Sequence, residues 1–443
     1  MAAAYRTTLA SLPVATLREV LLRLPVDERA HAAAVCRTWR DLLSDRSLWT
    51  RLDLSDAGGV ARTRVTDALL RGAAAKAGGG LTALSVNLLL SPLTDALMEV
   101  CAANSEALTE LRCGDIVGVA RLDALLRAAP LLRECHVAVF TSGDTVSRLL
   151  RNEPPFGPVR VNGLIITSPW PGDEAAMHTF AADWRASASQ PSYLGLQMAA
   201  RLGDGAFDAL VDVAVERRLE QFRLIELQSI IPASALARLL ASKSLTYVTI
   251  NGRFLNRTLL ISGLQSSVAL LAAAVRANGA LICVDLQASG ILGDASVAET
   301  LISALTAHPS FGRLYICKNP VAAADRARIG ASLGALVAAN SPHLRGLDVS
   351  RCDLGDEGLG PLVDALQVNT HLVYLSCSGN NMSEAFALHR LRPAILANTG
   401  LERLTLVSPS GNDGAPALQE LQQLVTDRSL ARAAERTAAN RNR

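Results

Sequence analysis

The sequence predicts an α/β fold in which a small helical domain precedes a solenoid, a horseshoe with parallel strands on its concave side and helices on its convex side. Three observations support this prediction. A short leucine pattern recurs along most of the chain, and each copy is followed by apolar residues at helical spacing. The residues before the first copy carry apolar stripes of helices instead.

The recurring pattern is L-x-x-L-x-L, and its copies lie about 29 residues apart on average. A unit of this size cannot bury its apolar face alone, so we expect about twelve units to stack into a solenoid over residues 53–426. The copies begin at Leu81, Leu108, Leu132, Val161, Pro191, Leu219, Leu245, Leu281, Phe311, Leu344, Leu372 and Leu401.

Each copy of the pattern is followed by residues whose apolar spacing changes from that of a strand to that of a helix. The clearest case is LGDEGLGPLVDALQVN, residues 354–369, in which Leu359, Leu362, Val363 and Leu366 form one helical stripe. Strand and helix together favour a strand–helix solenoid over the alternatives, a coiled coil or an all-helical repeat.

The first residues of the chain, 9–52, predict a small helical domain. One helical stripe consists of Leu17, Val20, Leu21 and Leu24, and a second of Val35, Trp39, Leu42 and Leu43. The segment WTRLDL, residues 49–54, already has the strand pattern of the repeats. We therefore expect the helical domain to pass directly into the solenoid, without a flexible linker.

The overall composition excludes several classes of function. A net charge of +2 predicts neither a nucleic-acid nor a membrane partner, and no apolar stretch is long enough to span a bilayer. The eight cysteines form no C-x-x-C pair, which predicts buried thiols in the cytosol or nucleus and no metal site. No catalytic motif is present, so we expect no enzyme and no cofactor. Residues 427–443 are expected to form a solvated basic tail, most simply a frayed helix.

The N-terminal domain resembles the F-box, whose pattern is L-P-x-x-x-L-x-E-[IV]-L, then L-P, V-C-x-x-W and L-W. This resemblance implies docking on a Skp-type adaptor and, through it, on the cullin of an SCF ubiquitin ligase. The residues expected to bind the adaptor are Leu12, Pro13, Leu17, Val20, Leu21, Val35, Cys36, Trp39, Leu48 and Trp49. The segment ERAHAAA, residues 28–34, departs from the leucines usual in the family. Burial of an alanine contributes roughly 2 kcal/mol less than burial of a leucine at a fully buried site. If those positions face the adaptor, we expect weaker docking than is usual in the family.

The repeats resemble leucine-rich repeats of the ribonuclease-inhibitor type. That family places an Asn or Cys three residues past each strand, and Asn319, Cys352 and Asn380 fit this rule, with Ser289 a near match. The N-terminal repeats depart from it, because the equivalent residues there are Leu89, Ile116, Phe140 and Pro169.

Residues at the third and fifth places of each copy point away from the core, onto the concave face. Tyrosine and arginine recur there, as in binding hot spots, although tyrosine also favours strands in general. The residues predicted to bind a protein substrate are Tyr193, Arg223, Tyr247, Arg313, Tyr315, Tyr374 and Arg403.

The predicted function is that of a non-catalytic substrate-recognition subunit of an SCF-type ubiquitin ligase. The first alternative is an interaction scaffold without a role in degradation. The second is a GTPase regulator or an inhibitor of the ribonuclease-inhibitor type, which would not need residues 1–50. The third is a small-molecule-sensing F-box protein, whose basic pocket Arg223, Arg313 and Arg403 would supply.

Overall fold

The computed structural model describes residues 13–24, 28–29, 32–54, 66–86, 95–167, 174–197, 204–227, 231–252, 261–262, 264–407 and 416–441. The chain divides into two compact units. The first unit consists of Met1–Thr167 and Ala182–Pro191, and the second of Ser168–Ala181 and Ser192–Arg443. Helix α8 (Glu174–Ala186) is divided between them in sequence.

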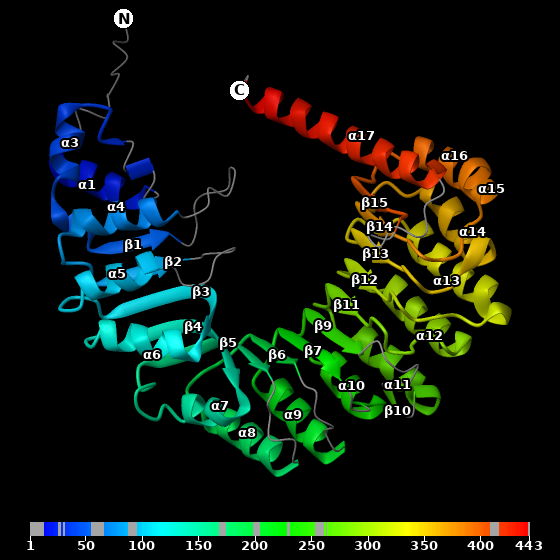
Figure 1. The fold of residues 1–443 in the computed structure, drawn as a ribbon, viewed down its shortest axis with the longest axis horizontal. Coiled ribbons are helices and arrows are strands. Elements are labelled where there is room, and N and C mark those ends of the chain that lie inside the picture. The colour runs from blue at the N-terminus through cyan, green and yellow to red at the C-terminus, as the bar shows by residue number, and fades with distance from the viewer. Residues whose placement is uncertain are drawn as a thin grey trace, which may run out of the picture. The chain divides into compact units, whose positions relative to one another are not determined.

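The strands of the first unit pair side by side in sequence order, and every pair is parallel. The helices follow the strands alternately and cover one side of the sheet (Figure 1). Its strands are β1 (Arg51–Leu54), β2 (Ala83–Val86), β3 (Glu110–Gly118), β4 (Glu134–Ser142) and β5 (Val159–Thr167). Its helices are α1 (Val14–Arg23), α3 (Arg37–Leu43), η2 (Arg46–Trp49), α4 (Asp67–Ala77), α5 (Asp95–Ala103), α6 (Val119–Ala128) and α7 (Gly143–Leu150).

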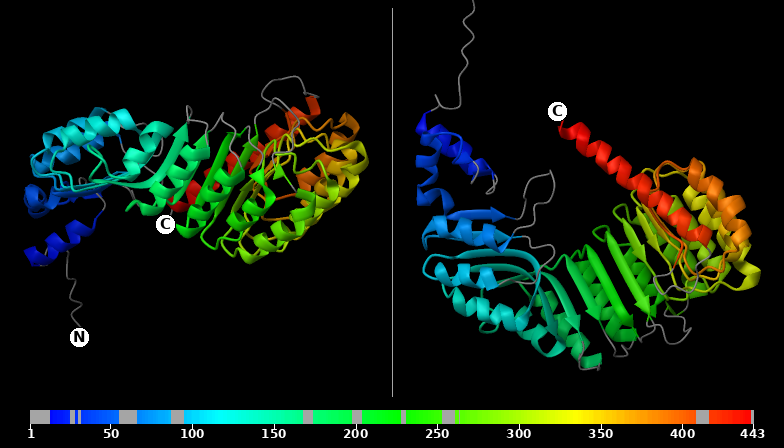
Figure 2. Two further views of the ribbon diagram at one scale, coloured as in Figure 1. Left: turned by 90° about the horizontal axis from the view of Figure 1, so that it is seen from below. Right: turned by 45° about the horizontal axis from the view of Figure 1, so that its top comes forward.

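The second unit has the same construction, with parallel strands in one layer and helices on one side of them (Figures 1 and 2). Its sheet consists of β6 (Tyr193–Gln197), β7 (Gln221–Leu227), β9 (Tyr247–Gly252), β11 (Cys283–Asp285), β12 (Arg313–Tyr315), β13 (Gly346–Asp348), β14 (Tyr374–Ser376) and β15 (Arg403–Thr405). Strands β8 (Ile231–Pro232) and β10 (Ile261–Ser262) form a separate small sheet.

The helices of the second unit alternate with its strands. They are α9 (Asp204–Glu216), α10 (Ala233–Leu240), α11 (Leu264–Ala277), α12 (Ala295–Thr306), η3 (Ala323–Asp325), α13 (Arg326–Ala338), α14 (Gly355–Leu366), α15 (Glu384–Phe386), η4 (Ala387–Leu391), α16 (Arg392–Ala397) and α17 (Pro416–Arg441). The fold class predicted from the repeat pattern is thus confirmed in each unit.

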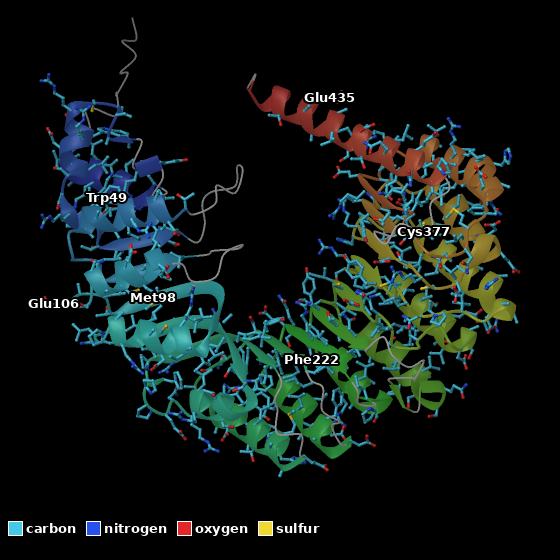
Figure 3. The ribbon with its side chains drawn as sticks, viewed as in Figure 1. Trp49, Met98, Glu106, Phe222, Cys377 and Glu435 are labelled. Carbon is cyan, nitrogen blue, oxygen red and sulfur yellow. The ribbon has the colours of Figure 1, made fainter. Side chains whose placement is uncertain are left out.

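Each core lies between the strand layer and the helix layer. Figure 3 shows Phe222 and Cys377 within the second unit, whereas Glu435 points away from it. The Phe222 ring meets that of Phe207 edge-on at 6.4 Å. The predicted stripe of Leu359 and its helical neighbours is buried along α14, which confirms the change of period. Pro361 lies inside this helix.

One predicted repeat frame was wrong. Cys135 in β4 pairs with Val159 in β5, so the repeat begins at the buried Phe156 and not at Val161. The two frames overlap within β5, where both Val159 and Leu164 are buried. A register shift after Val137 allows one strand to contain both apolar patterns. Only pairing with β4 chooses between them.

The chain from residue 416 forms a single helix against the last strand of the second unit. Buried Leu421 and Val425 on α17 pack toward this end, and the Gln422 carboxamide accepts a hydrogen bond from Leu406 N at 2.9 Å. Arg428 donates to the carbonyls of Ile395 at 3.1 Å and Asn398 at 2.6 Å. The predicted tail from residue 427 onward is therefore the second half of this helix as far as Arg441. Covering the last repeat is the usual task of a terminal element in a solenoid.

None of the helices in the described part of the chain combines the length and apolar character needed to cross a lipid bilayer.

Candidate binding surfaces

The N-terminal helical domain has a core of its own, built from large side chains. Leu17 and Leu21 of α1 are fully buried, as are Leu48 and Trp49 of η2, and Trp39 of α3 is nearly so. The Trp49 indole N–H donates to the Leu43 carbonyl at 2.9 Å, which satisfies the one polar atom of that ring. In this structure these side chains pack against each other.

Arg29 is part of this core, which the sequence did not indicate. Its guanidinium donates to the carbonyls of Leu48 at 2.8 Å, Leu24 at 3.0 Å and Leu22 at 3.1 Å. It also lies 5.7 Å from the centre of the Trp49 ring. Burial lowers the pKa of Arg29 below its usual value. In the sequence, Arg29 is visible only as an arginine within an alanine-rich segment. In the structure, its guanidinium connects α1 to η2.

The residues predicted to bind an adaptor therefore fall into two groups. Pro13 is exposed, and Val20 and Cys36 are partly exposed, whereas Leu12 lies outside the described residues. The buried group is Leu17, Leu21, Trp39, Leu48 and Trp49, which lie in the core of the domain and not on its surface. Their role in adaptor binding stays a prediction.

Val35 differs from its predicted place on the second helix. Helix α3 begins at Arg37, and Val35 lies in the turn before it with 65% of its surface exposed. Two further apolar side chains of α1, missed from the sequence, are also exposed: Val14 at 61% and Leu22 at 46%. Apolar groups thus remain on the surface of this domain after its core is filled.

The domain passes into the first repeat through a single residue, Thr50. Helix η2 ends at Trp49, β1 begins at Arg51, and the Thr50 carbonyl accepts a bond from Thr82 N at 2.7 Å. The Lys76 ammonium of α4 lies 4.2 Å from the centre of the Trp49 ring, a cation–π contact. The junction without a linker, expected from WTRLDL, is therefore present.

The predicted substrate-binding residues all lie in the second unit, in two neighbouring rows of its sheet. We call this surface, which comprises the residues of the two rows, the strand face. Backbone registers connect the rows from strand to strand. The first row is Tyr193, Gln221, Tyr247, Cys283, Arg313, Gly346, Tyr374 and Arg403. The second row is Gly195, Arg223, Thr249, Asp285, Tyr315, Asp348, Ser376 and Thr405.

Three large side chains, Arg313, Tyr315 and Tyr374, lie around Gly346. The rings of Tyr315 and Tyr374 lie 6.4 Å apart, tilted by 55°. Arg403 lies over the Tyr374 ring at 5.3 Å from its centre. A Cβ on Gly346 would stand 3.4 Å from Arg313 Cγ and 3.7 Å from the Tyr315 hydroxyl. The absence of a side chain at this position leaves room for these groups, and burial raises the pKa of both tyrosines.

The other end of the strand face combines an arginine with a carboxyl. Arg223 donates to the Tyr193 hydroxyl at 3.4 Å. Burial raises the pKa of Asp285 to about 6, although hydrogen bonds from Gln287 and the charge of Arg223 act in the opposite direction. This carboxyl therefore titrates near neutral pH.

The corresponding surface of the first unit contains a groove, and charged residues that line this groove form ion pairs with one another. A groove of about 610 Å³ lies between Leu22 and Arg29 on one side and the strands β1 to β3 on the other. Its carboxylate Glu110 binds Arg51 at 3.0 Å and Arg112 at 2.9 Å. The hydrogen bond from Arg51 is the main cause of the lowered pKa of Glu110.

The turns after the short strands of the second unit contain the expected buried polar residues. The Asn319 amide donates to the carbonyls of Leu286 and Ile316, each at 2.8 Å, and accepts from Gly290 N at 2.6 Å. Asn380 donates to Val349 O and Cys377 O, each at 2.9 Å. Cys352 and Ser289 also bond buried carbonyls. These residues hold the sheet and do not face a ligand.

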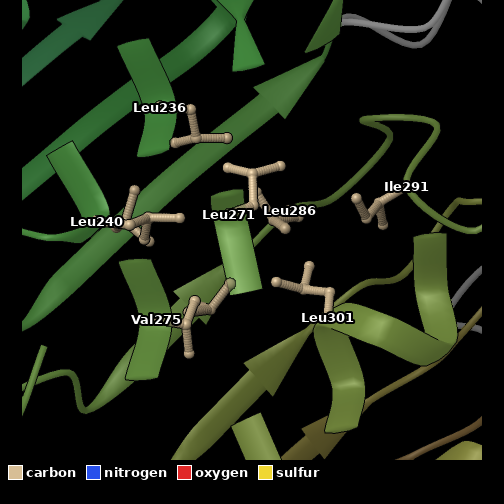
Figure 4. Close-up of a pocket in the computed structure, with 9 residues that line it drawn as sticks. Leu236, Leu240, Leu271, Val275, Leu286, Ile291 and Leu301 are labelled. Atoms are coloured by element: carbon tan, nitrogen blue, oxygen red, sulfur yellow. The ribbon is translucent and has the colours of Figure 1, made fainter. Parts of the chain in front are cut away.

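The enclosed cavity shown in Figure 4 lies in the core of the second unit. It measures about 10 Å³ and is lined by apolar side chains, among them Leu236, Leu271 and Leu301. A space of this size is at most one water molecule wide, and an apolar cavity stays dry. It is therefore a packing gap and not a ligand site.

Within the described ranges, no group of three histidine, cysteine or acidic side chains is placed to hold a metal ion. The eight cysteines are free, and all except the half-buried Cys36 are buried, as expected. Burial raises the pKa of the Cys101, Cys283 and Cys377 thiols to about 12, so these thiols stay protonated at neutral pH and are poor nucleophiles.

Protein-family models match residues 9–55 as F-box-like and residues 340–363 as a Leucine Rich repeat. The crystal structure of the yeast Rad7 and Elc1 complex is similar at 14% identity and a TM-score of 0.33, covering 66% of this chain and 85% of that one. An internalin from Listeria monocytogenes is similar at 14% identity and a TM-score of 0.33, covering 90% and 100%. The Caenorhabditis elegans tropomodulin C-terminal domain gives 16% identity and a TM-score of 0.32, covering 40% and 99%. No curated protein sequence matches.

Proposed function

We propose that this chain, which matches an F-box-like model and a leucine-rich-repeat model, is the substrate-recognition subunit of an SCF-type ubiquitin ligase. Proteins with this pair of domains are in general non-catalytic adaptors. In the proposed role, the F-box binds a Skp-type adaptor, and through it a cullin, while the strand face binds the protein to be modified. The protein is proposed to work in the cytosol or nucleus, where its eight free thiols would stay reduced.

The observation that carries the proposal is the F-box-like match over residues 9–55, on a domain that keeps apolar side chains at its surface. A domain this small is marginal alone, and a second apolar surface is useful only if a partner covers it. Val14 and Val35 are the most exposed of these groups. They support adaptor binding at the surface, while Leu17 and Trp49 maintain the core.

The direct junction at Thr50 also supports the proposal. Trp49 is held by its bond to Leu43 and contacts Lys76 of α4, so the F-box packs directly against the first repeat. A direct junction of this kind fixes the F-box relative to the first repeat.

The test is co-purification of Skp and cullin subunits with the full chain. The double variant Val14→Arg and Val35→Arg places two charges on exposed positions, so the fold should survive while adaptor recovery falls at least tenfold. The matched control is Leu131→Arg, since Leu131 is 51% exposed in the first unit but lies outside the F-box. Circular dichroism and the melting temperature verify folding of all three chains.

Equal recovery of the adaptor by the double variant and the control would place the interface elsewhere. Absence of Skp from the wild-type preparation would refute the ligase role itself. If Skp and cullin co-purify but the levels of captured proteins stay unchanged under a proteasome block, the non-degradative scaffold replaces the ligase subunit.

A further inference from the structure

Arginines on the helix side of the repeats and arginines on the strand face of the second unit have different surroundings. On the helix side, each inter-repeat arginine meets an acid of a neighbouring repeat at 2.6 to 2.8 Å. These pairs are Arg71–Glu99, Arg151–Asp183, Arg238–Asp208, Arg328–Glu299 and Arg390–Asp364. Each of these five guanidinium groups is therefore neutralised by an acid.

The three arginines of the strand face have no such partner among the described residues. Arg223 bonds only a tyrosine hydroxyl, Arg403 lies over an aromatic ring, and Arg313 extends beside the vacant side-chain position of Gly346. All three side chains are exposed. Guanidinium groups carry fixed donors suited to carboxylates, so these three are available to a binding partner.

The two carboxyls on the same face offset only part of the charge of the three arginines, although the charge of Arg223 does lower the pKa of Asp285. Asp348 accepts a hydrogen bond from Ser350 N at 2.9 Å, and Asp285 accepts one from Gln287 N at 3.3 Å. Both are half-buried and directed to the backbone of the turn that follows their strands. The other titratable groups beside them are the Cys283 thiol and the Tyr315 and Tyr374 hydroxyls. Burial raises the pKa of all three, so they stay uncharged at neutral pH. The outward charge of the face is therefore positive.

The three arginines are evenly spaced across the strands of the sheet. The order of the sheet is β7, β9, β11, β12, β13, β14, β15, so Arg223, Arg313 and Arg403 each stand three strands from the next. With strands roughly 4.8 Å apart, three strands amount to about 14 Å. An extended peptide advances about 3.4 Å per residue, so about four of its residues cover this interval.

We propose that the strand face of the second unit binds an extended acidic segment of the protein target, with its carboxylates on Arg223, Arg313 and Arg403 and its apolar groups on Tyr315 and Tyr374. The inference rests on the proposed function for the identity of the occupant as a target protein. The charge and the tyrosine rings of the face determine the chemistry of that segment.

The experiment is a fluorescence-anisotropy titration of the full chain with a labelled twelve-residue peptide that has Glu at every fourth position and Gly and Ser elsewhere. We expect saturable binding that weakens as salt is raised, because exposed ion pairs are screened. A peptide with Lys in place of Glu should bind at least tenfold more weakly. A peptide with the same three Glu in one consecutive run should bind about threefold more weakly.

The variants test which arginines act. R223Q, R313Q and R403Q should each weaken binding of the Glu peptide about fivefold. The matched controls are R328Q and R390Q, which remove paired arginines from the helix side of the same unit and should leave peptide affinity unchanged. The melting temperature of each variant verifies that it is folded.

The inference is overturned if the Glu peptide does not bind up to about 1 mM, or if the control variants weaken binding as much as the strand-face variants. Clearly tighter binding of a peptide with phosphoserine in place of Glu would overturn the choice of carboxylates. The titration uses no adaptor, so its failure is distinct from a failure of Skp co-purification, which concerns the proposed function alone.

Discussion

Strands β3, β4 and β5 of the first unit each contain nine residues, whereas β11 to β15 of the second unit contain three. Both sets come from the same repeated pattern and pair in the same parallel way. The difference arises just after the strand. In the second unit the carbonyls that follow the strand are bonded by buried side chains such as Asn319 and Asn380. In β4 the equivalent residue is Phe140, and the strand continues past it to Ser142.

The hydrogen bonds of one buried asparagine amide can therefore take the place of several residues of strand pairing. Backbone carbonyls inside a protein must find donors, from a neighbouring strand or from a side chain. Where an asparagine supplies the donor, the chain can turn at once toward its helix. Where an apolar residue occupies the site, the ladder of the sheet must continue.

The largest expected effect comes from removing the buried amide that follows a short strand. Asn380→Leu deletes two donated bonds and the two that its oxygen accepts from Cys352 N at 3.0 Å and Leu354 N at 3.2 Å. We expect a loss of about 3 to 5 kcal/mol in the free energy of unfolding, measured in urea. The control Phe140→Leu, at the equivalent and exposed position, should change that free energy by about 1 kcal/mol or less. Equal losses in both variants would contradict the explanation.

A second difference concerns helix packing. In the second unit, a Cβ on Gly330 of α13 would stand 2.2 Å from the Gly358 carbonyl oxygen of α14, so Gly330→Ala forces the helices apart. We expect Gly330→Ala to lower the free energy of unfolding by about 2 to 3 kcal/mol. In the first unit, Gly72 of α4 has no atom within 4 Å of the same position, so Gly72→Ala should stabilise by about 0.5 to 1 kcal/mol. Urea unfolding measures the change in the free energy of unfolding for each variant. Changes of the same sign in the two variants would contradict this explanation.

The last prediction depends on pH and concerns the half-buried carboxyl of Asp285 on the strand face of the second unit. The pKa of Asp285 is raised to about 6 by burial, so its charged form is disfavoured in the folded chain. Its penalty is absent below the unfolded pKa near 4 and grows until pH passes about 6. Asp285→Asn should therefore stabilise by about 1 to 2 kcal/mol at pH 7 and be neutral at pH 4. A benefit that is constant with pH would contradict this assignment.

Much of the fold followed from the sequence because strand and helix periods differ. The stripe of α14, the start of β1 and the buried turn residues Asn319 and Cys352 were all predicted. The frame of the repeat at Phe156 was not, because β5 contains two alternating apolar patterns. Val35 was expected on a helix, but α3 starts two residues later and leaves Val35 exposed.

For the candidate surfaces, the sequence indicated which residues of the second unit share a face, since alternation along a strand is a local property. It could not indicate that Arg313 has no acidic partner within the described ranges while Arg328 has one, because pairing depends on which strands and helices become neighbours. Nor could it divide the F-box leucines and tryptophans between core and surface.

The amino-acid order by itself determined the repeat, its strand–helix alternation and the buried polar turns, because each depends on spacing within a few dozen residues. Tertiary structure alone decided which charges are neutralised, which register β5 adopts and which apolar side chains remain exposed. These outcomes depend on distances between residues far apart in the chain, and only the stacking of the repeats sets those distances.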